Sequence, residues 1–303
     1  MQFYLPIAEI SVNAFLLLGL GMAVGILSGM FGIGGGFILT PLLFMIGIPS
    51  AVAVGTQGIL IVASSFSALL AHLKRKTVDY PMGIVLLTGG LIGSAGGVRL
   101  FKLLSALGQV DLLISLCYVF LLGTVGSLML IEAVNAYRRR GSNTYVPAKR
   151  KKHNWVHGMP FRIRFRASKM YISVLPPLAI GIAVGVLSAI MGVGGGFLML
   201  PAMIYILGMP TKVVVGTSLF QITFMSSFTT LLHATENYTV DFVLGFILLI
   251  GGVTGAQIGS RVGAKLNADI LRILLASMVL GISLKLLTEL VFQPTEIFSL
   301  FAK

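Results

Sequence analysis

Long apolar segments separated by short polar ones dominate the pattern along this chain of 303 residues. A helix that crosses a hydrocarbon core about 30 Å thick needs about 20 apolar residues. Eight segments approach or exceed that length: 14–31, 51–73, 82–101, 112–131, 174–191, 213–232, 242–260 and 270–290. Two shorter apolar runs, 37–46 and 197–207, reach only about 15 to 17 Å as helices. The pattern predicts an all-α integral membrane protein that crosses the bilayer many times.

Composition agrees with a bilayer environment. The mean hydropathy is +0.99, and 56% of the residues are hydrophobic while 10% are charged. No Lys or Arg precedes the first apolar run and no small-residue cleavage pattern follows it, so we expect that run to be retained rather than removed as a signal peptide. Cys117, the only cysteine, lies in a predicted span, which excludes an intrachain disulfide and a cysteine-based metal centre. We expect no cofactor and no metal.

The chain contains one unit twice. Residues 21–41 align without gaps to residues 181–201 with 12 identities in 21 positions. Shorter matches follow, with VGT at 54–56 and 215–217 and TVD at 77–79 and 239–241. Such internal similarity indicates a duplicated structural unit. We therefore predict three parts: a first transmembrane repeat over 1–136, a basic linker over 137–171, and a second transmembrane repeat over 172–303.

Each repeat is expected to hold a first helix, a glycine loop, a short helix and three full transmembrane helices. The short helix forms either a hairpin with the first helix, which we favour, or a thin crossing of its own. Positive charge then orients the repeats, because cytoplasmic loops are rich in Lys and Arg. The first repeat carries cations at 74–76, whereas the matching loop of the second carries only Glu236 and the next loop holds Arg261, Lys265 and Arg272. The charges predict repeats of inverted topology with both termini outside.

The linker accounts for much of the formal charge of +13. Eleven of the 22 Lys and Arg residues lie between Arg138 and Lys169. We predict that the linker is cytoplasmic in a multi-pass protein of the cell membrane. Its cations could contact anionic lipid headgroups at about 1 kcal/mol each, and a nucleic-acid or other partner is an alternative. We prefer a solvated loop that orients the protein in the membrane. The sequence leaves the oligomeric state open.

Matched glycine loops are the first candidate site. Inverted repeats commonly place a transport site at their interface, where the N-termini of interrupted helices face an anion. Uncovered backbone N–H groups at such a helix start bind an anion without a cationic side chain. Close helix packing is the alternative reason for glycine. The candidates are Gly32, Gly34, Gly35, Gly36, Gly192, Gly194, Gly195 and Gly196.

A polar cluster follows each loop, near the start of the next span. Its hydroxyl and amide groups could donate to the oxygens of an anion, and in lipid they must face protein or water. Helix–helix hydrogen bonding is the alternative, which we prefer for Ser64, Ser65, Ser226 and Ser227. The substrate-binding candidates of this cluster are Thr56, Gln57, Thr217, Ser218 and Gln221.

Charged side chains suggest no catalytic residue. The carboxylates nearest to spans precede helix starts and are interpreted as N-caps, which argues against a buried proton relay: Asp79, Asp111, Asp241 and Asp269. Arg99 and Arg261 occupy matched positions, where they attract an anion or, as we prefer, extend to the membrane surface. His72 and His233 also match, near the ends of spans, and are expected to make interfacial hydrogen bonds.

At these residues the chain resembles the sulfite exporter TauE/SafE family. The repeated unit of that family is similar to the GxGGGF-x3-P and VGT segments, and the resemblance covers nearly all of the chain except the linker. It implies a carrier of sulfite, sulfoacetate or a related organosulfonate. The residues alone indicate only a small anion as the substrate and the lipid bilayer as the surroundings.

We therefore expect a secondary transporter that exports a small sulfur-containing anion by alternating access between the two repeats. An anion channel for small oxyanions is the main alternative, because it would use the same loops without two closed states. An intramembrane enzyme based on Ser28, Ser188, His72 and His233 is disfavoured, since the histidines lie at the far ends of other spans. A static scaffold is disfavoured by the many glycines within spans.

Overall fold

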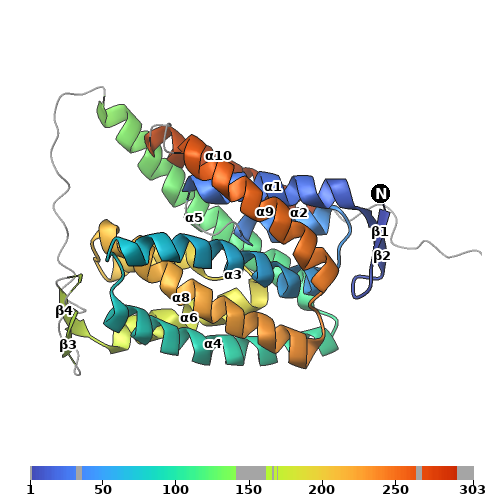
Figure 1. Ribbon diagram of the computed structural model, residues 1–303, viewed down its shortest axis with the longest axis horizontal. Coiled ribbons are helices and arrows are strands. Elements are labelled where there is room, and N and C mark those ends of the chain that lie inside the picture. The colour runs from blue at the N-terminus through green and yellow to red at the C-terminus, as the bar shows by residue number, and fades with distance from the viewer. Residues whose placement is uncertain are drawn as a thin grey trace, which may run out of the picture. The chain divides into compact units, whose positions relative to one another are not determined.

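Helices form nearly all of the computed structural model, which describes residues 2–31, 36–140, 162–165, 167–168, 170–263 and 268–291 (Figure 1). The first repeat contains α1 (Ala14–Phe31), α2 (Gly36–Met45), α3 (Ser50–Lys74), α4 (Tyr80–Ala106) and α5 (Val110–Arg140). The second repeat contains α6 (Leu175–Met191), α7 (Gly196–Pro201), the π-helical turn η2 (Ala202–Ile206), α8 (Thr211–Leu232), η3 (His233–Asn237), α9 (Phe242–Gly263) and α10 (Ala268–Val291). Every span expected from the apolar pattern is a helix.

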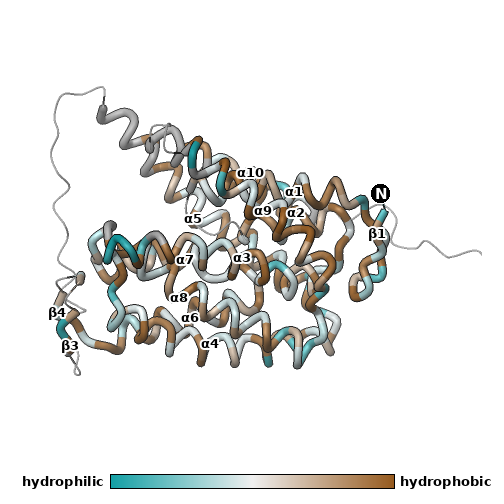
Figure 2. The backbone as a smooth tube through the Cα atoms, in the orientation of Figure 1, coloured by the Kyte–Doolittle hydropathy of each residue, from teal (hydrophilic) through white to brown (hydrophobic). Residues whose placement is uncertain are grey.

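Five helices of the described chain are long and apolar enough to cross a membrane, judged by length and composition. They cover Ser50–Lys74, Tyr80–Ala106, Val110–Ile131, Val213–Asn237 and Phe242–Gly259. In Figure 2 the helices are mostly pale or brown, and hydrophilic residues gather at helix ends and in turns. Because the exposed faces of these helices carry many large apolar side chains, the protein is an all-α membrane protein.

Two β-hairpins were not predicted. Strand β1 (Gln2–Leu5) pairs antiparallel with β2 (Ile10–Asn13) directly before α1, and β3 (Arg162–Phe165) pairs with β4 (Met170–Ser173) directly before α6. Their four-residue strands are too short for a clear alternation of apolar and polar residues. The two hairpins lie at opposite ends of the unit that contains them (Figure 1). Residues 141–161 of the predicted linker lie outside the described residues.

The helices separate into two compact units, and each unit takes helices from both repeats. One unit comprises Met1–Gly108 and Pro147–Lys265, and the other comprises Gln109–Val146 and Leu266–Lys303. In the second unit, α5 packs along α10, and the Ser283 hydroxyl donates to the carbonyl oxygen of Val119 at 3.1 Å.

Helices of the first unit pack in pairs that join one repeat to the other. Helix α1 packs against α9, α6 packs against α4, and α3 packs against α8 between them. The contacts are matched: a β-carbon on Gly255 of α9 would lie 2.2 Å from the Met22 carbonyl oxygen of α1, and one on Gly93 of α4 would lie 2.2 Å from the Ile182 carbonyl oxygen of α6. Glycine at these two positions permits backbone contact, as small residues do in membrane helices.

Two of the predicted N-caps are confirmed. The Asp79 carboxylate accepts from the Met82 N–H at the start of α4, and the Asp241 carboxylate accepts from the Val243 N–H at the start of α9. Asp111 lies within the first turn of α5 instead of before it. The side chain of Asp269 lies outside the described residues.

Candidate functional site

A sharp glycine loop joins α6 to the short helix α7. Helix α6 ends at Gly192, whose N–H donates to the Ser188 carbonyl oxygen at 2.7 Å. Gly192, Gly194 and Gly195 have φ values of +72°, +72° and +76°, and Gly196 begins α7. Because L-residues rarely adopt such φ values, the loop conformation itself calls for glycine. We call residues 192–196 the glycine loop.

The glycine loop is fully buried against the central helices. The Gln57 amide of α3 donates to the carbonyl oxygens of Met191 and Gly192, at 3.3 Å to the former. A β-carbon on Gly194 would lie 3.0 Å from the Ser226 hydroxyl oxygen of α8. The N–H groups of Gly194 and Gly195 donate to no backbone acceptor in the described part of the chain. Among the described residues, these two N–H groups therefore lack a backbone partner in a buried loop, which is a feature that an anion site requires.

The first repeat's loop meets this one through its last residue. Gly32, Gly34 and Gly35 lie outside the described residues. Gly36 starts α2, and a β-carbon there would lie 3.1 Å from the Val193 carbonyl oxygen. The rings of Phe37 and Phe197, which follow the two loops, stack with centroids 4.6 Å apart. The short helices of both repeats thus begin beside each other in the interior of the first unit.

A small cavity lies beside the glycine loop, between α3, α6 and α8, and we call it the polar cavity because hydroxyl and imidazole side chains are among its lining residues. Its volume, as space for the centre of a water-sized sphere, is about 10 Å³, which is about enough for one water molecule. The residues that line this polar cavity are Val54, Gly55, Gly58, Ile61, Ser188, Gly192, Gly194, Ser226, Thr229, Thr230 and His233. The buried Ser226 hydroxyl has no hydrogen-bond partner within the part of the chain that the structure describes, so it is available to a molecule in the cavity. An anion larger than water needs the cavity to widen.

His233 closes the wall of the polar cavity. Its Nε2 lies 2.9 Å from the Ala189 carbonyl oxygen and its Nδ1 lies 3.0 Å from the Asn237 amide nitrogen, while the ring meets Phe101 edge-on. A neutral ring that carries its proton on Nε2 satisfies both bonds. The sequence predicts a hydrogen bond of His233 at the membrane–water interface. Hydrogen bonds are present, but the residue is only 1% exposed, so the predicted location is wrong. The imidazole is therefore part of the interior site.

Sequence reasoning missed most of the residues around this cavity. The sequence pattern favours a helix–helix contact for Ser226 and singles out neither Thr229 nor Thr230. The signal was present, because Ser226, Thr229 or Thr230, and His233 recur three to four residues apart and so share one face of α8. A polar stripe on a membrane helix is the pattern expected for a wall that faces a cavity.

The predicted polar cluster is buried, but its groups are engaged elsewhere. The hydroxyl oxygens of Thr56 and Thr217 accept from the N–H groups of Asp241 and Asp79, at 2.9 and 3.0 Å. The Ser218 hydroxyl donates to the Val215 carbonyl oxygen within its own helix, at 2.9 Å. The Gln221 amide nitrogen lies 2.9 Å from the Met225 sulfur, and its amide oxygen has no partner. Of the cluster, only Gln57 touches the glycine loop directly in this conformation.

The two predicted arginines lie away from the polar cavity. Arg99 of α4 and Arg261 of α9 are both exposed, and neither lines the polar cavity. This placement suits side chains that extend toward the membrane surface.

The matching end of the α3–α8 pair is filled by apolar side chains. The offset of 161 residues that relates Thr56 to Thr217 also relates Gly58 to Leu219 and Leu69 to Thr230. Leu69, Val78 and Leu219 form a buried cluster, with Leu73, Val215 and Phe220 packed against it. We call Leu69, Val78 and Leu219 the leucine plug. The pair therefore carries a polar cavity near one end and the leucine plug near the other.

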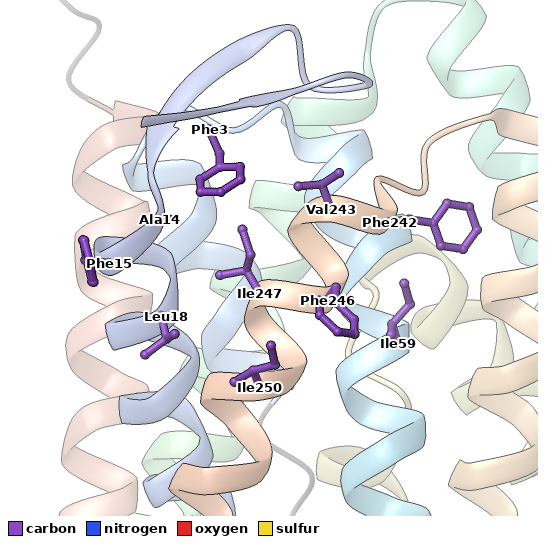
Figure 3. Close-up of a pocket in the computed structure, with 10 residues that line it drawn as sticks. All are labelled: Phe3, Ala14, Phe15, Leu18, Ile59, Phe242, Val243, Phe246, Ile247 and Ile250. Carbon is purple, nitrogen blue, oxygen red and sulfur yellow. The ribbon is translucent and has the colours of Figure 1, made fainter. Parts of the chain in front are cut away.

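A larger groove on the first unit has an apolar lining (Figure 3). Its volume is about 710 Å³, and it lies between α1 and α9 with Phe3 of β1 at one end. Its lining residues are Phe3, Ala14, Phe15, Leu18, Ile59, Phe242, Val243, Phe246, Ile247 and Ile250. Because these side chains offer no hydrogen-bond donor, the groove suits hydrocarbon and not an anion.

A multi-pass helical protein with a buried glycine loop and a polar cavity between its spans belongs to the class of membrane transporters. A family model described as Sulfite exporter TauE/SafE matches residues 17–286. The chain belongs to this family, and the resemblance inferred from its motifs is confirmed.

Curated relatives agree with this class. The chain is 31% identical over 231 residues to the probable membrane transporter protein YunE of Bacillus subtilis, covering 71% of this chain and 75% of that protein. It is 26% identical over 268 residues to the probable membrane transporter protein YjnA of the same organism, covering 88% and 97%. Sulfite exporter TauE/SafE family protein 3 of Arabidopsis thaliana is 27% identical over 128 residues, covering 40% of this chain and 27% of that protein. No solved structure matches the chain.

Proposed function

We propose that this protein exports a small sulfur-containing anion, such as sulfite, sulfoacetate or a related organosulfonate, by alternating access. The observation that carries the proposal is the buried glycine loop, in which the N–H groups of Gly194 and Gly195 have no backbone acceptor among the described residues, beside a cavity lined in part by hydroxyl groups. The names of the Arabidopsis relative and of the family support sulfite as the substrate class. The protein would act as a transporter and not as an enzyme.

The anion would bind to backbone and hydroxyl donors. Gly194 and Ser226 both line the polar cavity, Gly195 follows Gly194 in the glycine loop, and no Lys or Arg of the described residues lines the cavity. Backbone donors fixed in a dry interior stabilise negative charge more strongly than the same groups do in water. The predicted ligands of the first loop and of Thr56, Thr217, Ser218 and Gln221 remain part of the proposal, for a conformation in which those groups are released.

Inverted repeats support alternating access. Matched helix pairs, matched backbone contacts and a hairpin at each end of the first unit are what two oppositely oriented copies would produce. The loop cations orient the copies, so that the Lys74 end of α3 and the linker lie in the cytoplasm and both termini lie outside. The leucine plug, near the Lys74 end, would then close the cytoplasmic side.

Membrane potential favours the direction of transport. Each negative charge that leaves a cell with a negative interior gains about 2.3 kcal/mol per 100 mV. A dianion gains about 4.6 kcal/mol, which supports a gradient of a few thousandfold without a coupling ion.

Flux from proteoliposomes tests the proposal. Vesicles that hold the purified protein are loaded with sulfite or a sulfonate, and efflux is followed at set membrane potentials. We expect saturable efflux that increases when the loaded side is made negative, and no such efflux from protein-free vesicles. An absence of potential-dependent efflux for every sulfur anion would refute the exporter. Linear flux with single-channel currents would instead indicate the anion channel.

A further inference from the structure

The two buried aspartates at helix starts make the same set of bonds at opposite ends of the first unit. Asp79 and Asp241 are each 1% exposed. The backbone N–H of Asp79 donates to the Thr217 hydroxyl oxygen, and that of Asp241 donates to the Thr56 hydroxyl oxygen. Asp79 belongs to the first repeat and Thr217 to the second, while the order is reversed for the other pair. Each bond therefore joins the two repeats.

Each aspartate also holds the β-hairpin that directly precedes the first helix of the other repeat. The Asp241 carboxylate accepts from the N–H of Ile7, in the turn between β1 and β2, at 3.0 Å. The Asp79 carboxylate accepts from the N–H and the hydroxyl of Ser168, in the turn between β3 and β4, at 2.9 and 2.6 Å. Charge-assisted bonds of this kind are stronger than neutral ones. The β1–β2 hairpin, which precedes α1, is thereby fixed to the start of α9, the partner of α1. The β3–β4 hairpin, which precedes α6, is fixed in the same way to the start of α4, the partner of α6.

These bonds divide the first unit into two arms, each made of a hairpin and two helices, and the central α3–α8 pair. Hairpin β1–β2, α1 and α9 are tied through Asp241 and through the backbone contacts of α1 with α9. Hairpin β3–β4, α6 and α4 are tied in the same way through Asp79. Towards the central α3–α8 pair, each of these two arms is held at its helix start by one threonine hydroxyl. The Thr217 hydroxyl accepts one bond there, whereas the Thr56 hydroxyl also donates to the Thr239 carbonyl oxygen at 3.5 Å. Neutral hydrogen bonds of this kind, worth about 0.5–1.5 kcal/mol each, are strong enough to bias a conformation and weak enough to break during transport.

We infer that the Thr56–Asp241 and Thr217–Asp79 hydrogen bonds are two opposed clamps, each of which holds one end of the transporter closed. The inference rests on the alternating access proposed above. The Thr217 clamp lies beside the leucine plug, since Val78 precedes Asp79, and the Thr56 clamp lies beside the polar cavity, since Gly55 precedes Thr56. Opening one end requires release of its clamp while the other clamp stays closed.

If the bonds are opposed clamps, loss of one bond shifts the population of conformations in the direction opposite to loss of the other. A purely structural role for the bonds does not predict this. Thr217→Val and Thr56→Val keep the shape of the side chain and remove the hydroxyl, which in Thr56 also donates to the Thr239 carbonyl oxygen. If the bonds are clamps, Thr217→Val shifts the population toward opening at the leucine plug and Thr56→Val shifts it toward opening at the polar cavity. The loss of one hydrogen bond corresponds to a shift of about two- to tenfold.

Cysteine labelling measures this shift without any substrate. In a Cys117→Ser background, Leu69→Cys reports on the leucine plug and Thr229→Cys reports on the polar cavity, each labelled with a membrane-impermeant maleimide from both sides. We expect Thr217→Val to raise labelling at position 69 and lower it at position 229, and Thr56→Val to do the reverse. Threonine-to-serine variants should restore the original rates. Thr88→Val is the matched control, because the Thr88 hydroxyl is exposed and bonds only within α4.

Two outcomes would overturn the clamps: both valine variants change the two reporters in the same direction, or neither changes them while the proteins remain folded by thermal melting. The result is separable from the proposed substrate. If the two valine variants shift labelling in opposite directions but the unsubstituted protein transports no sulfur anion, the proposed substrate is refuted and the clamps stand. If the unsubstituted protein transports a sulfur anion but both variants shift labelling in the same direction, only the clamps are refuted.

Discussion

The two ends of the α3–α8 pair share a backbone plan and differ in what fills it. At one end Gly58 faces Thr230, and a β-carbon on Gly58 would lie 1.9 Å from the Thr230 hydroxyl oxygen. At the other end the matched residues, Leu219 and Leu69, pack in the leucine plug. The first pairing lies beside the polar cavity, and the second is a buried apolar contact. Duplication thus supplied a symmetric scaffold, and side-chain differences gave each end its own role.

Some contacts between the repeats are the same at both ends. The cross-repeat bonds of Thr56 and Thr217 and the backbone contacts of Gly93 and Gly255 recur at both ends with nearly equal geometry. These contacts define how the helices meet. The cavity wall, in contrast, depends on side chains that can change without moving a helix.

The largest effect is expected when the apolar pairing is copied onto the polar end. Gly58→Leu together with Thr230→Leu reproduces the pairing that the leucine plug already accommodates, so overpacking should cost only about 1–3 kcal/mol. We expect efflux to fall by at least about a hundredfold, because the polar cavity would be filled. Flux and thermal melting are measured on the same preparation, with Leu219→Met as the control of similar volume. Efflux within twofold of the original protein would contradict a role for the cavity.

The reverse change should open the closed end. Leu69→Thr places a hydroxyl in the leucine plug, where a buried polar group without a partner costs about 1–3 kcal/mol. We expect water to enter and passive leakage of anions to rise by about tenfold, together with a lower melting temperature. The measurement is efflux at zero membrane potential. Unchanged leakage at a lowered melting temperature would mean that the leucine plug stabilises the fold without sealing the pathway.

A smaller effect separates two buried serines. Ser65 and Ser226 occupy matched positions, both hydroxyls are buried without a partner, and only Ser226 lines the polar cavity. Removal of one hydrogen bond to an anion costs about 1.5–3 kcal/mol. Ser226→Ala should therefore raise the apparent KM by about ten- to a hundredfold, and Ser65→Ala should raise it less. Equal increases for both variants would argue against a substrate position set by this cavity.

Sequence reasoning predicted the helices well because each is a long apolar run with clear ends. The short helices fell within one residue of 37–46 and 197–207, since the glycines before them and the glycines after them mark both ends. The N-cap positions of Asp79 and Asp241 followed from the same logic.

The site was harder to predict, because it depends on which groups are left unpaired. Thr56 and Thr217 look like ligands in the sequence, yet only the packing of α9 on α3 and of α4 on α8 brings the aspartate N–H groups to their hydroxyls. Ser226 looks like one more helix–helix contact until Gly194 is seen against it. Long-range contacts of this kind leave no periodic signal.

Equilibrium binding of radiolabelled sulfite to the purified protein tests the central claim most directly, because it requires neither a gradient nor a conformational cycle. If the polar cavity holds the substrate, saturable binding is lost in the Gly58→Leu, Thr230→Leu variant and retained in the Leu219→Met control, with both proteins folded. Saturable binding that survives filling of the polar cavity would contradict this claim.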